Sequence, residues 1–314
     1  MSRKKIQIIT SYPFHSEPVI KNRLSPFITM AIKYNYQVQI VSPDNEVFTI
    51  EGAPCDHILV PDPFRKPKNL AKRMWFEIKQ ARRLINAAIA FDADYTMITV
   101  PSMFLLFQMY LFKKNPVIVD LRDITWDYVS SSNPVLAAIK KVFEFLARTN
   151  LKKALFINVT NTTERDYLLG NFRLKNVEVI SVPNGVTKNQ FHQLSNVTVN
   201  TSAPLKIAYI GNVGIGQNLR FLVDVAIKLP HIHFYIVGCG TDFTSLKKYA
   251  EKANIANLTM TGRLDWSEVK EMYTSAHILY AQLTPDFGMA MPSKLYEYLS
   301  TGKFVIYGGQ HQAK

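Results

Sequence analysis

A short stretch near the end of the sequence combines the residue types of an anion-binding helix start. Pro292 and Ser293 precede Lys294, and Glu297 follows Ser293 by four positions. Proline and serine favour a first helical turn, where free N–H groups and the helix dipole attract an anion. Glu297 would lie on the same face, roughly 6 Å further along. This offset fits the pyrophosphate and ribose of one nucleotide. A surface glutamate paired with its neighbouring lysine is the simpler alternative.

A glycine-rich turn, "YIGNVGIGQNL" from Tyr209 to Leu219, gives a second signal. Gly211, Gly214 and Gly216 allow a tight turn between a strand and a helix, and present N–H groups to an anion. The pattern therefore predicts phosphate binding, with a plain strand-to-helix turn as the alternative. The G-x-x-G-x-G spacing is not that of a dinucleotide fingerprint, and the next strand ends in Gly238 where an acid would hold a ribose.

Two clusters in the first half of the chain are candidates for a ligand-binding role. The stretch "VDLRDITWDY" places Asp120, Arg122, Asp123 and Asp127 just beyond an apolar strand, which is the ligand edge of a parallel sheet. An ion-paired structural loop would give the same pattern. The segment after the first strand adds polar side chains that we expect to line the cleft from the first domain: His15, Glu17, Asn22 and Arg23. A purely structural histidine is the alternative.

No metal site is expected. Asp92 and Asp94 have D-x-D spacing but precede a strand, at the wrong edge of the sheet, and the seven histidines show no ligand spacing. Cys55 and Cys239 also lack paired spacing, which favours free thiols in a reducing cytoplasm. The basic N-terminus runs directly into a short strand, without the apolar region of an export signal.

Short apolar strands alternate with helical stretches along the whole chain, which predicts parallel sheets covered by helices. The α/β pattern restarts after a polar stretch and gives two tandem, doubly wound, Rossmann-like domains. We expect domain boundaries at 1–183 and 205–314, joined by a linker over 184–204. Ligands of such sheets bind beyond the carboxyl ends of the strands, so a site is expected where the domains face each other. The second domain looks incomplete, because it ends on a strand with no helix to cover it.

The helices are expected over 24–34, 70–90, 135–151 and 162–171 in the first domain, and over 218–229, 244–253, 266–276 and 293–301 in the second. The strands are expected near 5–10, 37–42, 57–60, 95–100, 117–120, 154–159, 177–182, 205–210, 233–237, 258–261, 278–282 and 304–307.

The net charge of +13 indicates an acidic partner. Eight lysines and arginines stand between Arg65 and Arg83 against the single acid Glu77, and the helix over 70–84 is basic and amphipathic. An apolar run over 101–112 is too short to span a bilayer. Both segments fit a membrane surface, and equally a solvated helix face plus a buried core helix. No nucleic-acid-binding module accompanies the charge, so nucleic acid is not the expected partner.

Taken in order, these motifs resemble the GT-B fold glycosyltransferases of family 4, in particular those that build bacterial capsule, exopolysaccharide and O-antigen chains. The resemblance runs from "KIQIITSYPF" through "VIVDLRDITWDY", "SVPNGVTKNQF" and "YIGNVGIGQNL" to "PSKLYEYLSTGKFVI". It implies a retaining, metal-independent transfer from a nucleotide-diphosphate sugar to a saccharide or lipid-linked acceptor, without a cofactor. It also implies a cytoplasmic protein, peripheral to the membrane where the helix over 70–84 contacts it.

The resemblance also implies roles for individual residues. Glu297 would hold the ribose, and Lys294 would stabilise the departing diphosphate. Asp120 and Asp123 would face the acceptor, with Lys294 and these two as the catalytic candidates. The remaining donor-binding residues would be Gly211, Asn212, Gly214, Gln217, Arg263, Leu264 and Ser293.

The chain departs from the family pattern in three places. The first acid of the E-x7-E motif falls on Met289, with Asp286 out of register. Asn212 and Gln217 stand where many relatives carry arginine and lysine. The closing helices that brace the first domain have no counterpart, which suggests a truncated chain. A sugar-nucleotide 2-epimerase of the same fold, or a non-catalytic nucleotide-sugar-binding protein, are the alternatives.

Overall fold

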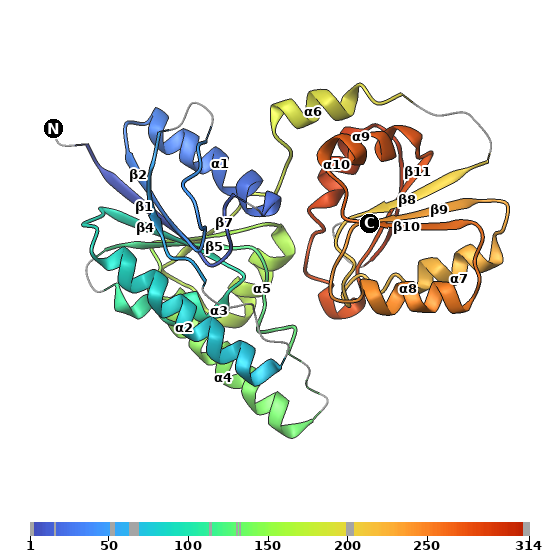
Figure 1. The fold of residues 1–314 in the computed structure, drawn as a ribbon. Helices are drawn as coiled ribbons and strands as arrows, with labels where there is room; N and C mark the ends of the chain where they lie inside the picture. The colour runs from blue at the N-terminus through green and yellow to red at the C-terminus, as the bar shows by residue number, and fades with distance from the viewer. Residues whose placement is uncertain are drawn as a thin grey trace. The chain divides into compact units, whose positions relative to one another are not determined.

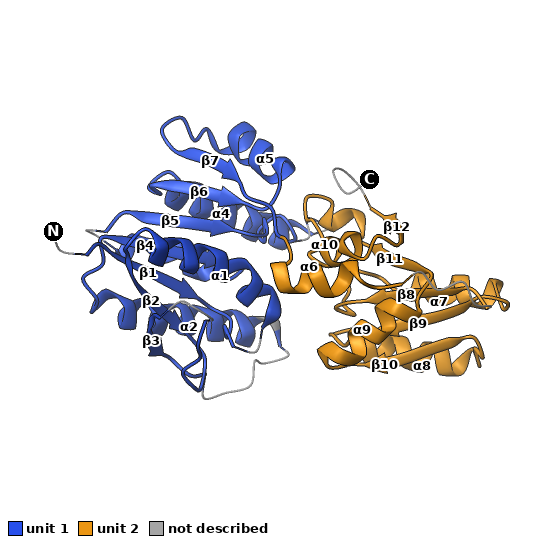
Figure 2. Cartoon of the chain, turned by 90° about the horizontal axis from the view of Figure 1, so that it is seen from above, with its two compact units in different colours: residues 1–184 blue, residues 185–314 orange. Residues whose placement is uncertain are grey.

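The computed structural model describes residues 3–15, 17–50, 54–62, 69–112, 115–129, 131, 133–198 and 204–309. The chain divides into two compact units, Met1–Asn184 (unit 1) and Gly185–Lys314 (unit 2), which are blue and orange in Figure 2. Each unit has its own sheet and its own hydrophobic core.

Unit 1 is built on a sheet of seven described strands in the order β3-β2-β1-β4-β5-β6-β7. All neighbouring pairs are parallel, so the carboxyl ends of the strands meet at one edge. The central strands are buried on both faces, which is why they consist of near-continuous apolar runs. The bounds are Lys5–Thr10 (β1), Gln37–Ser42 (β2), Asp56–Leu59 (β3), Tyr95–Val100 (β4), Val117–Leu121 (β5), Phe156–Val159 (β6) and Glu178–Ser181 (β7).

The described helices of unit 1 cover both faces of this sheet (Figure 1). α1 packs Ile20, Leu24 and Ile28 against one face, and the buried side chains of α2 and α3 cover the other. The bounds are Pro18–Lys33 (α1), Leu70–Ile89 (α2), Met103–Phe107 (α3), Pro134–Leu151 (α4) and Thr162–Phe172 (α5), with a 3-10 turn over Met109–Leu111 (η1).

Unit 2 repeats the design with five described strands in the order β10-β9-β8-β11-β12, again all parallel. The strands are Lys206–Ile210 (β8), His233–Val237 (β9), Leu258–Gly262 (β10), Ile278–Gln282 (β11) and Phe304–Gly308 (β12). The helices are Lys188–Ser195 (α6), Arg220–Lys228 (α7), Phe243–Lys252 (α8), Trp266–Ser275 (α9) and Lys294–Ser300 (α10), with a 3-10 turn over Pro285–Phe287 (η2). The two parallel, Rossmann-like sheets confirm the predicted α/β fold.

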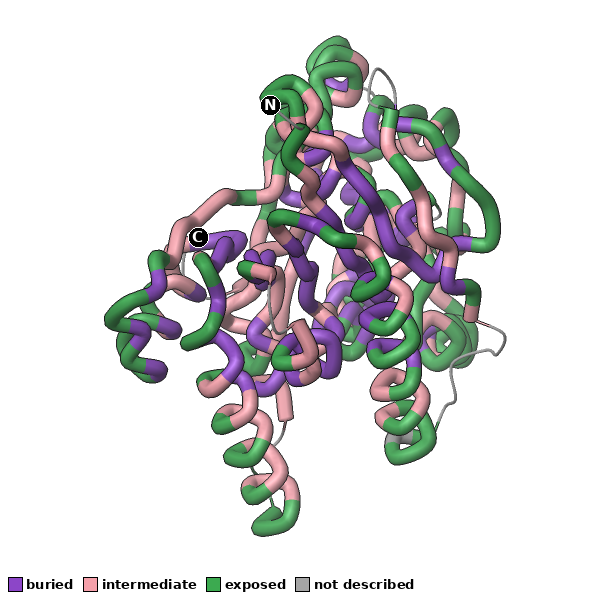
Figure 3. Tube along the Cα trace, turned by 90° about the vertical axis from the view of Figure 1, so that its left-hand side faces the viewer, coloured by how far each residue is buried: buried purple, intermediate pink, exposed green. Residues whose placement is uncertain are grey.

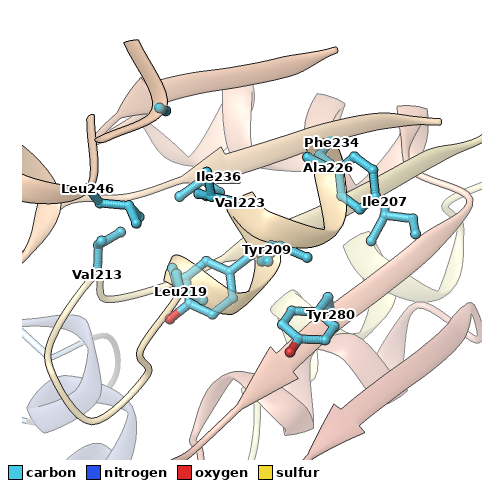
Figure 4. Packing of buried hydrophobic residues seen from close by; sticks show 12 residues of the cluster. Ile207, Tyr209, Val213, Leu219, Val223, Ala226, Phe234, Ile236, Leu246 and Tyr280 are labelled. Carbon is cyan, nitrogen blue, oxygen red and sulfur yellow. The ribbon is translucent and has the colours of Figure 1, made fainter. Parts of the chain in front are cut away.

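Buried residues concentrate in the strands and on the helix faces that cover them (Figure 3). In unit 2, α7 and α8 close one face of the sheet, where Val223, Phe234 and Ile236 are almost completely buried. Tyr209 and Leu219, at the two ends of the glycine-rich turn, and Val213 within it insert into the same cluster (Figure 4). The turn is therefore anchored at both ends by apolar packing.

The structure differs from the sequence-based expectation in three elements. α1 begins at Pro18 rather than Leu24, because Pro18 occupies the first turn, where its missing N–H has no cost. The expected linker over 184–204 contains α6, which starts with a capping box between Thr187 and Gln190 and packs Leu194 into unit 2. The apolar run over 101–112 forms α3, in which Phe104–Phe107 are buried, and η1, in which Met109 is buried and Tyr110 is exposed, so the buried core helix describes α3.

Candidate active site

α10 places Glu297 inside unit 2. Glu297 is only 8% exposed, and the Tyr273 hydroxyl of α9 donates a hydrogen bond to its Oε2 (2.9 Å). Lys294, one turn earlier, donates to both carboxylate oxygens (2.9 and 2.8 Å). Burial, followed by the charge of Glu297, raises the pKa of Tyr273 well above its usual value, so the phenol remains a donor. Glu297 is thus a fixed acceptor, and not the exposed partner of a surface lysine.

Tyr298 fastens α10 to the end of β8. Its hydroxyl accepts from the Ile210 amide (2.8 Å) and donates to the Ile210 carbonyl (3.0 Å). The Tyr298 side chain is fully buried. Because Ile210 immediately precedes Gly211, this one side chain sets the position of the helix relative to the glycine-rich turn. The sequence analysis did not single out Tyr298; a tyrosine on the buried face of a short helix was the available signal.

The glycine-rich turn is held by its own hydrogen bonds. The Gly211 amide donates to the Val237 carbonyl (2.9 Å) and the Val213 amide to the Cys239 carbonyl (3.0 Å). Gln217 Oε1 accepts from the Gly214 amide (3.1 Å) and from the Asn212 side chain (3.2 Å). The expectation that Gly211 offers its N–H to an anion therefore conflicts with the structure, because that donor is used by β9.

The same turn lies against the side chain of Lys294. A Cβ built on Gly211 would stand 3.5 Å from Cγ of Lys294 and 3.0 Å from the Tyr209 hydroxyl. The structure thus brings together two predicted pieces of the donor site, although they are 83 positions apart in the sequence (294 − 211). Ser293, just before α10, makes no side-chain capping bond.

Two glycines that the sequence analysis did not assign to the site make this arrangement possible. Gly238 has φ +131°, and a Cβ there would lie 1.8 Å from the Gly211 carbonyl oxygen. A Cβ on Gly240 would lie 2.3 Å from the Val213 carbonyl oxygen. The G-x-G at the end of β9 therefore permits close backbone approach. Its position directly after a buried strand was the signal that could have revealed it.

The other predicted residues of unit 2 have different surroundings. Arg263 is exposed beyond the end of β10, whereas Leu264 packs against the core cluster on the α9 face. Asp286 is exposed in η2, and Met289 occupies the position where the family's motif has an acid. These placements leave the assignment of Arg263 and Leu264 to a nucleotide base as a prediction.

Asp120, at the end of β5, is completely buried and bonded on both oxygens. Arg23 reaches it through Nη2 (2.7 Å), and Asn158 donates from Nδ2 (2.6 Å), while Thr99 donates to Oδ2 (3.2 Å). Arg23 Nη1 also donates to the carbonyl groups of residues 182 and 183 (2.6 and 3.1 Å). The ion-paired structural interpretation holds for Asp120 and for Arg23, and neither presents a free group to an acceptor.

Asp123 has more accessible surroundings than Asp120 and accepts from the Tyr128 hydroxyl (3.1 Å). Burial raises the pKa of its carboxyl, and the charge of Arg122 offsets part of that rise. Glu164, three residues into the turn that starts α5, lies beside it. Burial, followed by the charge of Asp123, raises the pKa of Glu164 to about 8. Glu164 was missed because its sequence pattern is that of an ordinary helix start.

The remaining candidates lie at the surface or serve as structural contacts. His15 is half-exposed and 3.7 Å from Glu46, and Asp94 accepts from the Lys5 amide (2.7 Å) as a loop residue. Cys55 and Cys239 are free. Among the described residues, no three His, Cys, Asp or Glu side chains are grouped as a metal site. Arg65, Lys66 and Lys68 of the predicted basic segment lie outside the described residues.

Comparison with known families supports an enzyme class. Residues 192–310, which include the glycine-rich turn and α10, match the family described as glycosyl transferases group 1. A comparison with curated proteins finds no match. The family match over these residues supports a glycosyltransferase.

Solved structures with the same architecture show the fold. Sucrose-phosphate synthase from Thermosynechococcus elongatus is similar with a TM-score of 0.74 and 14% identity, over 98% of this chain and 82% of that one. WaaG, a glycosyltransferase involved in lipopolysaccharide biosynthesis, is similar with a TM-score of 0.66 and 12% identity, over 96% of this chain and 80% of that one. Anabaena HepE in complex with UDP and glucose is similar with a TM-score of 0.62 and 11% identity, over 98% of this chain and 82% of that one. These likenesses support the GT-B fold for both units.

Proposed function

We propose that the protein transfers a sugar from a nucleotide-diphosphate sugar to a saccharide or lipid-linked acceptor in the synthesis of a bacterial surface polysaccharide. Unit 2 binds the donor and unit 1 binds the acceptor. The observation that carries the proposal is the buried Glu297, held by Tyr273 on a helix that Tyr298 fixes beside the glycine-rich turn. Burial of a carboxylate costs free energy, and a buried carboxylate beside a glycine-rich turn is a candidate for ligand binding.

Each part of the donor has its own set of residues in this proposal. Glu297 accepts from the ribose hydroxyls, and Lys294 turns from Glu297 toward the pyrophosphate. Ser293, Asn212, Gly214 and Gln217 contact the phosphates, with Arg263 and Leu264 beside the base. Lys294 and the helix dipoles stabilise the negative charge that develops on the leaving diphosphate, which is the principal catalytic contribution of such a site. The transfer is proposed to be retaining and to need no metal.

Variants of Lys294 and Glu297 test separately whether these residues bind the phosphate and the ribose of a nucleotide. Calorimetry would compare UDP, GDP, dTDP and ADP with the corresponding nucleosides. Glu297→Gln is expected to weaken both nucleotide and nucleoside by about 10- to 100-fold, because a charge-assisted hydrogen bond is worth about 1.5–3 kcal/mol. Lys294→Met is expected to weaken the nucleotide alone.

Two exposed residues of α9 supply matched controls, Lys270→Met and Glu271→Gln, which should leave both affinities unchanged. Binding of no nucleotide would reject the proposal. If the donor is consumed without an acceptor and its sugar is inverted at C2, as followed by NMR, the 2-epimerase alternative is correct.

The helix α2 supports a further part of the proposal, contact with an anionic membrane at its cytoplasmic face. No side chain over 71–79 is buried; Trp75 is 60% exposed, and Lys79 Nζ stands 5.0 Å from the centre of its ring. On α4, Val142 and Phe145 are also exposed. Among the described helices, none is long and apolar enough to span a membrane. A basic helix with an exposed tryptophan fits the interface between headgroups and acyl chains.

Sedimentation with lipid vesicles tests the membrane contact. The wild type should bind phosphatidylglycerol vesicles, and not phosphatidylcholine vesicles, with an affinity that falls as salt rises. Lys72→Glu with Lys79→Glu should reduce this binding by about tenfold or more, since each basic residue near such a surface contributes about 1 kcal/mol. The control, Lys247→Glu with Lys248→Glu on α8 of unit 2, should have a smaller effect. Equal binding to both lipids would reject the contact.

A further inference from the structure

Buried polar groups without partners collect at the carboxyl edge of the sheet in unit 1. Among the described residues, the buried atoms that lack a hydrogen-bond partner include Arg122 Nη1 beyond β5, Glu164 Oε1 beyond β6 and Ser102 Oγ beyond β4. β4, β5 and β6 are neighbours in the sheet, so these groups belong to one edge. Leaving such a group unsatisfied costs about 1–3 kcal/mol. Buried groups of this kind are completed by ordered water or by a ligand, and their position at the ligand edge of a parallel sheet favours a ligand.

The two oxygens of Glu164 have different surroundings. Oε2 accepts from both the amide (2.9 Å) and the hydroxyl (2.7 Å) of Thr160, whereas Oε1 has no partner. The residue is completely buried, and the negative charge of Asp123 acts on it. A buried carboxyl beside a second carboxylate holds a proton. Since Oε2 already accepts two bonds, the proton belongs on Oε1, which becomes a donor without an acceptor.

Arg122, Asp123 and Glu164 together match a ligand that both donates and accepts hydrogen bonds. Arg122 Nη1 and the protonated Oε1 of Glu164 are donors, while the carboxylate of Asp123 is an acceptor with capacity beyond the bond from Tyr128. A hydroxyl group satisfies both needs, because it donates one hydrogen bond and accepts others. A carboxylate or phosphate would satisfy the two donors but would be repelled by Asp123.

We propose that Arg122, Asp123 and Glu164 bind a pair of neighbouring hydroxyl groups on the acceptor sugar, with Glu164 acting as a neutral carboxylic acid. The inference rests on the proposed function, since it names the chemistry of the acceptor side. It assigns Glu164 a binding role in addition to its place at the start of α5. The charged or titratable groups that act on this cluster from its own and neighbouring segments are Tyr12, Asp127 with its partner Lys140, and Tyr128.

The test measures the binding of methyl α-glucoside, methyl α-galactoside and methyl α-mannoside by saturation-transfer NMR between pH 6 and 9.5. These probes present neighbouring hydroxyls in different orientations. At least one should bind the wild type at pH 6, and its affinity should fall toward tenfold per pH unit above about pH 8, where Glu164 loses its proton.

The variant Glu164→Gln distinguishes binding from helix capping. Glutamine at this position keeps an oxygen for the Thr160 amide and a neutral donor, so the probe should bind at pH 6 as in the wild type, without the alkaline decline. Arg122→Met should reduce binding by tenfold or more at every pH. Glu178→Gln, an exposed residue of β7, is the matched control and should reproduce the wild-type profile.

Two results would overturn the inference: none of the three glycosides binds, or the wild type and Glu164→Gln show the same pH profile. UDP, GDP, dTDP and ADP binding measured on the same samples keeps the two proposals apart. Nucleotide binding with no glycoside binding rejects only the hydroxyl site. Glycoside binding with no nucleotide binding rejects the proposed donor site and leaves the hydroxyl site standing.

Discussion

Both units end their parallel strands in loops that carry polar residues, but the two edges are completed differently. In unit 2 the described residues contain no buried side-chain polar atom without a partner, and the turn around Gly211 is held by backbone bonds and by Gln217. In unit 1 the corresponding edge leaves Ser11, Ser102, Arg122 and Glu164 with unmet hydrogen-bonding capacity. Unit 2 thus has a pre-formed edge, whereas the edge of unit 1 has buried polar groups that are left for water or a ligand to complete.

The difference follows from how each edge is built. Unit 2 relies on close approach between backbones, which glycines at 238 and 240 permit and which leaves few side chains to satisfy. Unit 1 relies on charged side chains, and one of its carboxylates, Asp120, is fully used in holding Arg23. What remains of the charged set, around Asp123 and Glu164, is available to a ligand.

The largest expected effect concerns the structural carboxylate of unit 1. Asp120→Ala should lower the stability of unit 1 by about 3–5 kcal/mol, because it leaves the buried Arg23 charge without its partner. Hydrogen exchange by mass spectrometry reports each unit separately, so peptides of unit 2 should keep their protection. Asp127→Ala, whose ion pair with Lys140 is partly exposed, should cost no more than about 1 kcal/mol. Comparable losses in both variants would contradict the structural role of Asp120.

The glycine that shapes the edge of unit 2 gives the next effect. Gly238→Ala places a Cβ against the Gly211 carbonyl and imposes a positive φ on alanine, so unit 2 should lose about 3 kcal/mol and nucleotide binding with it. Gly170→Ala in α5 is the control, since a Cβ there meets nothing within 4 Å. It should be neutral or stabilising by about 0.5–1 kcal/mol. If Gly238→Ala binds nucleotide normally, the turn does not depend on this approach.

How far the sequence predicts these edges depends on the kind of interaction. The strands were predictable because those of a parallel sheet contain buried runs of apolar residues, as over Ile8–Ile9 and Val117–Val119. α10 was predictable from Pro292 and Ser293. α6 was hidden, because only one of its residues, Leu194, is buried and its start depends on a local capping box.

Long-range partners were the part that sequence could not supply. Asp120 and Asp123 are three positions apart and look alike, yet one meets Arg23 from α1 and the other faces Tyr128. Likewise, nothing local shows that Tyr298 binds the backbone of Ile210, 88 residues earlier. These contacts depend on the order of strands in the sheet, and they decide which carboxylate is structural.

A smaller effect is expected at the joint between α10 and β8. Tyr298→Phe removes the hydroxyl that pairs with both the N–H and the carbonyl of Ile210, at a cost of about 1–3 kcal/mol for unsatisfied buried groups. Exchange should increase in peptides that cover β8 and α10, and UDP affinity should fall with it. Leu299→Gln, the next residue and 68% exposed, is the control and should change neither. An unchanged exchange rate in Tyr298→Phe would show that apolar packing alone positions α10.

The last effects are pH slopes, which are small per pH unit, and they should have opposite signs in the two units. The folded-state pKa of Glu164 is raised to about 8 from its usual 4.5, so unfolding releases its proton over that window. Unit 1 should therefore lose stability as pH rises from about 4.5 to 8, by less than about 1.4 kcal/mol per pH unit, and Glu164→Gln should flatten the slope.

In unit 2, hydrogen bonds from the backbone of Glu268 and the side chain of Ser267 lower the pKa of Asp265 below 3.8. The ionised Asp265 carboxyl stabilises unit 2 above that pH, and this stabilisation is lost as pH falls further. The stability of unit 2 should therefore decrease at acid pH. Asp265→Asn keeps the N-cap and should remove this acid dependence. Exchange protection measured against pH in the two variants checks both slopes. If Glu164→Gln leaves the slope of unit 1 unchanged, the carboxyl is ionised at neutral pH and the edge of unit 1 is not donor-rich.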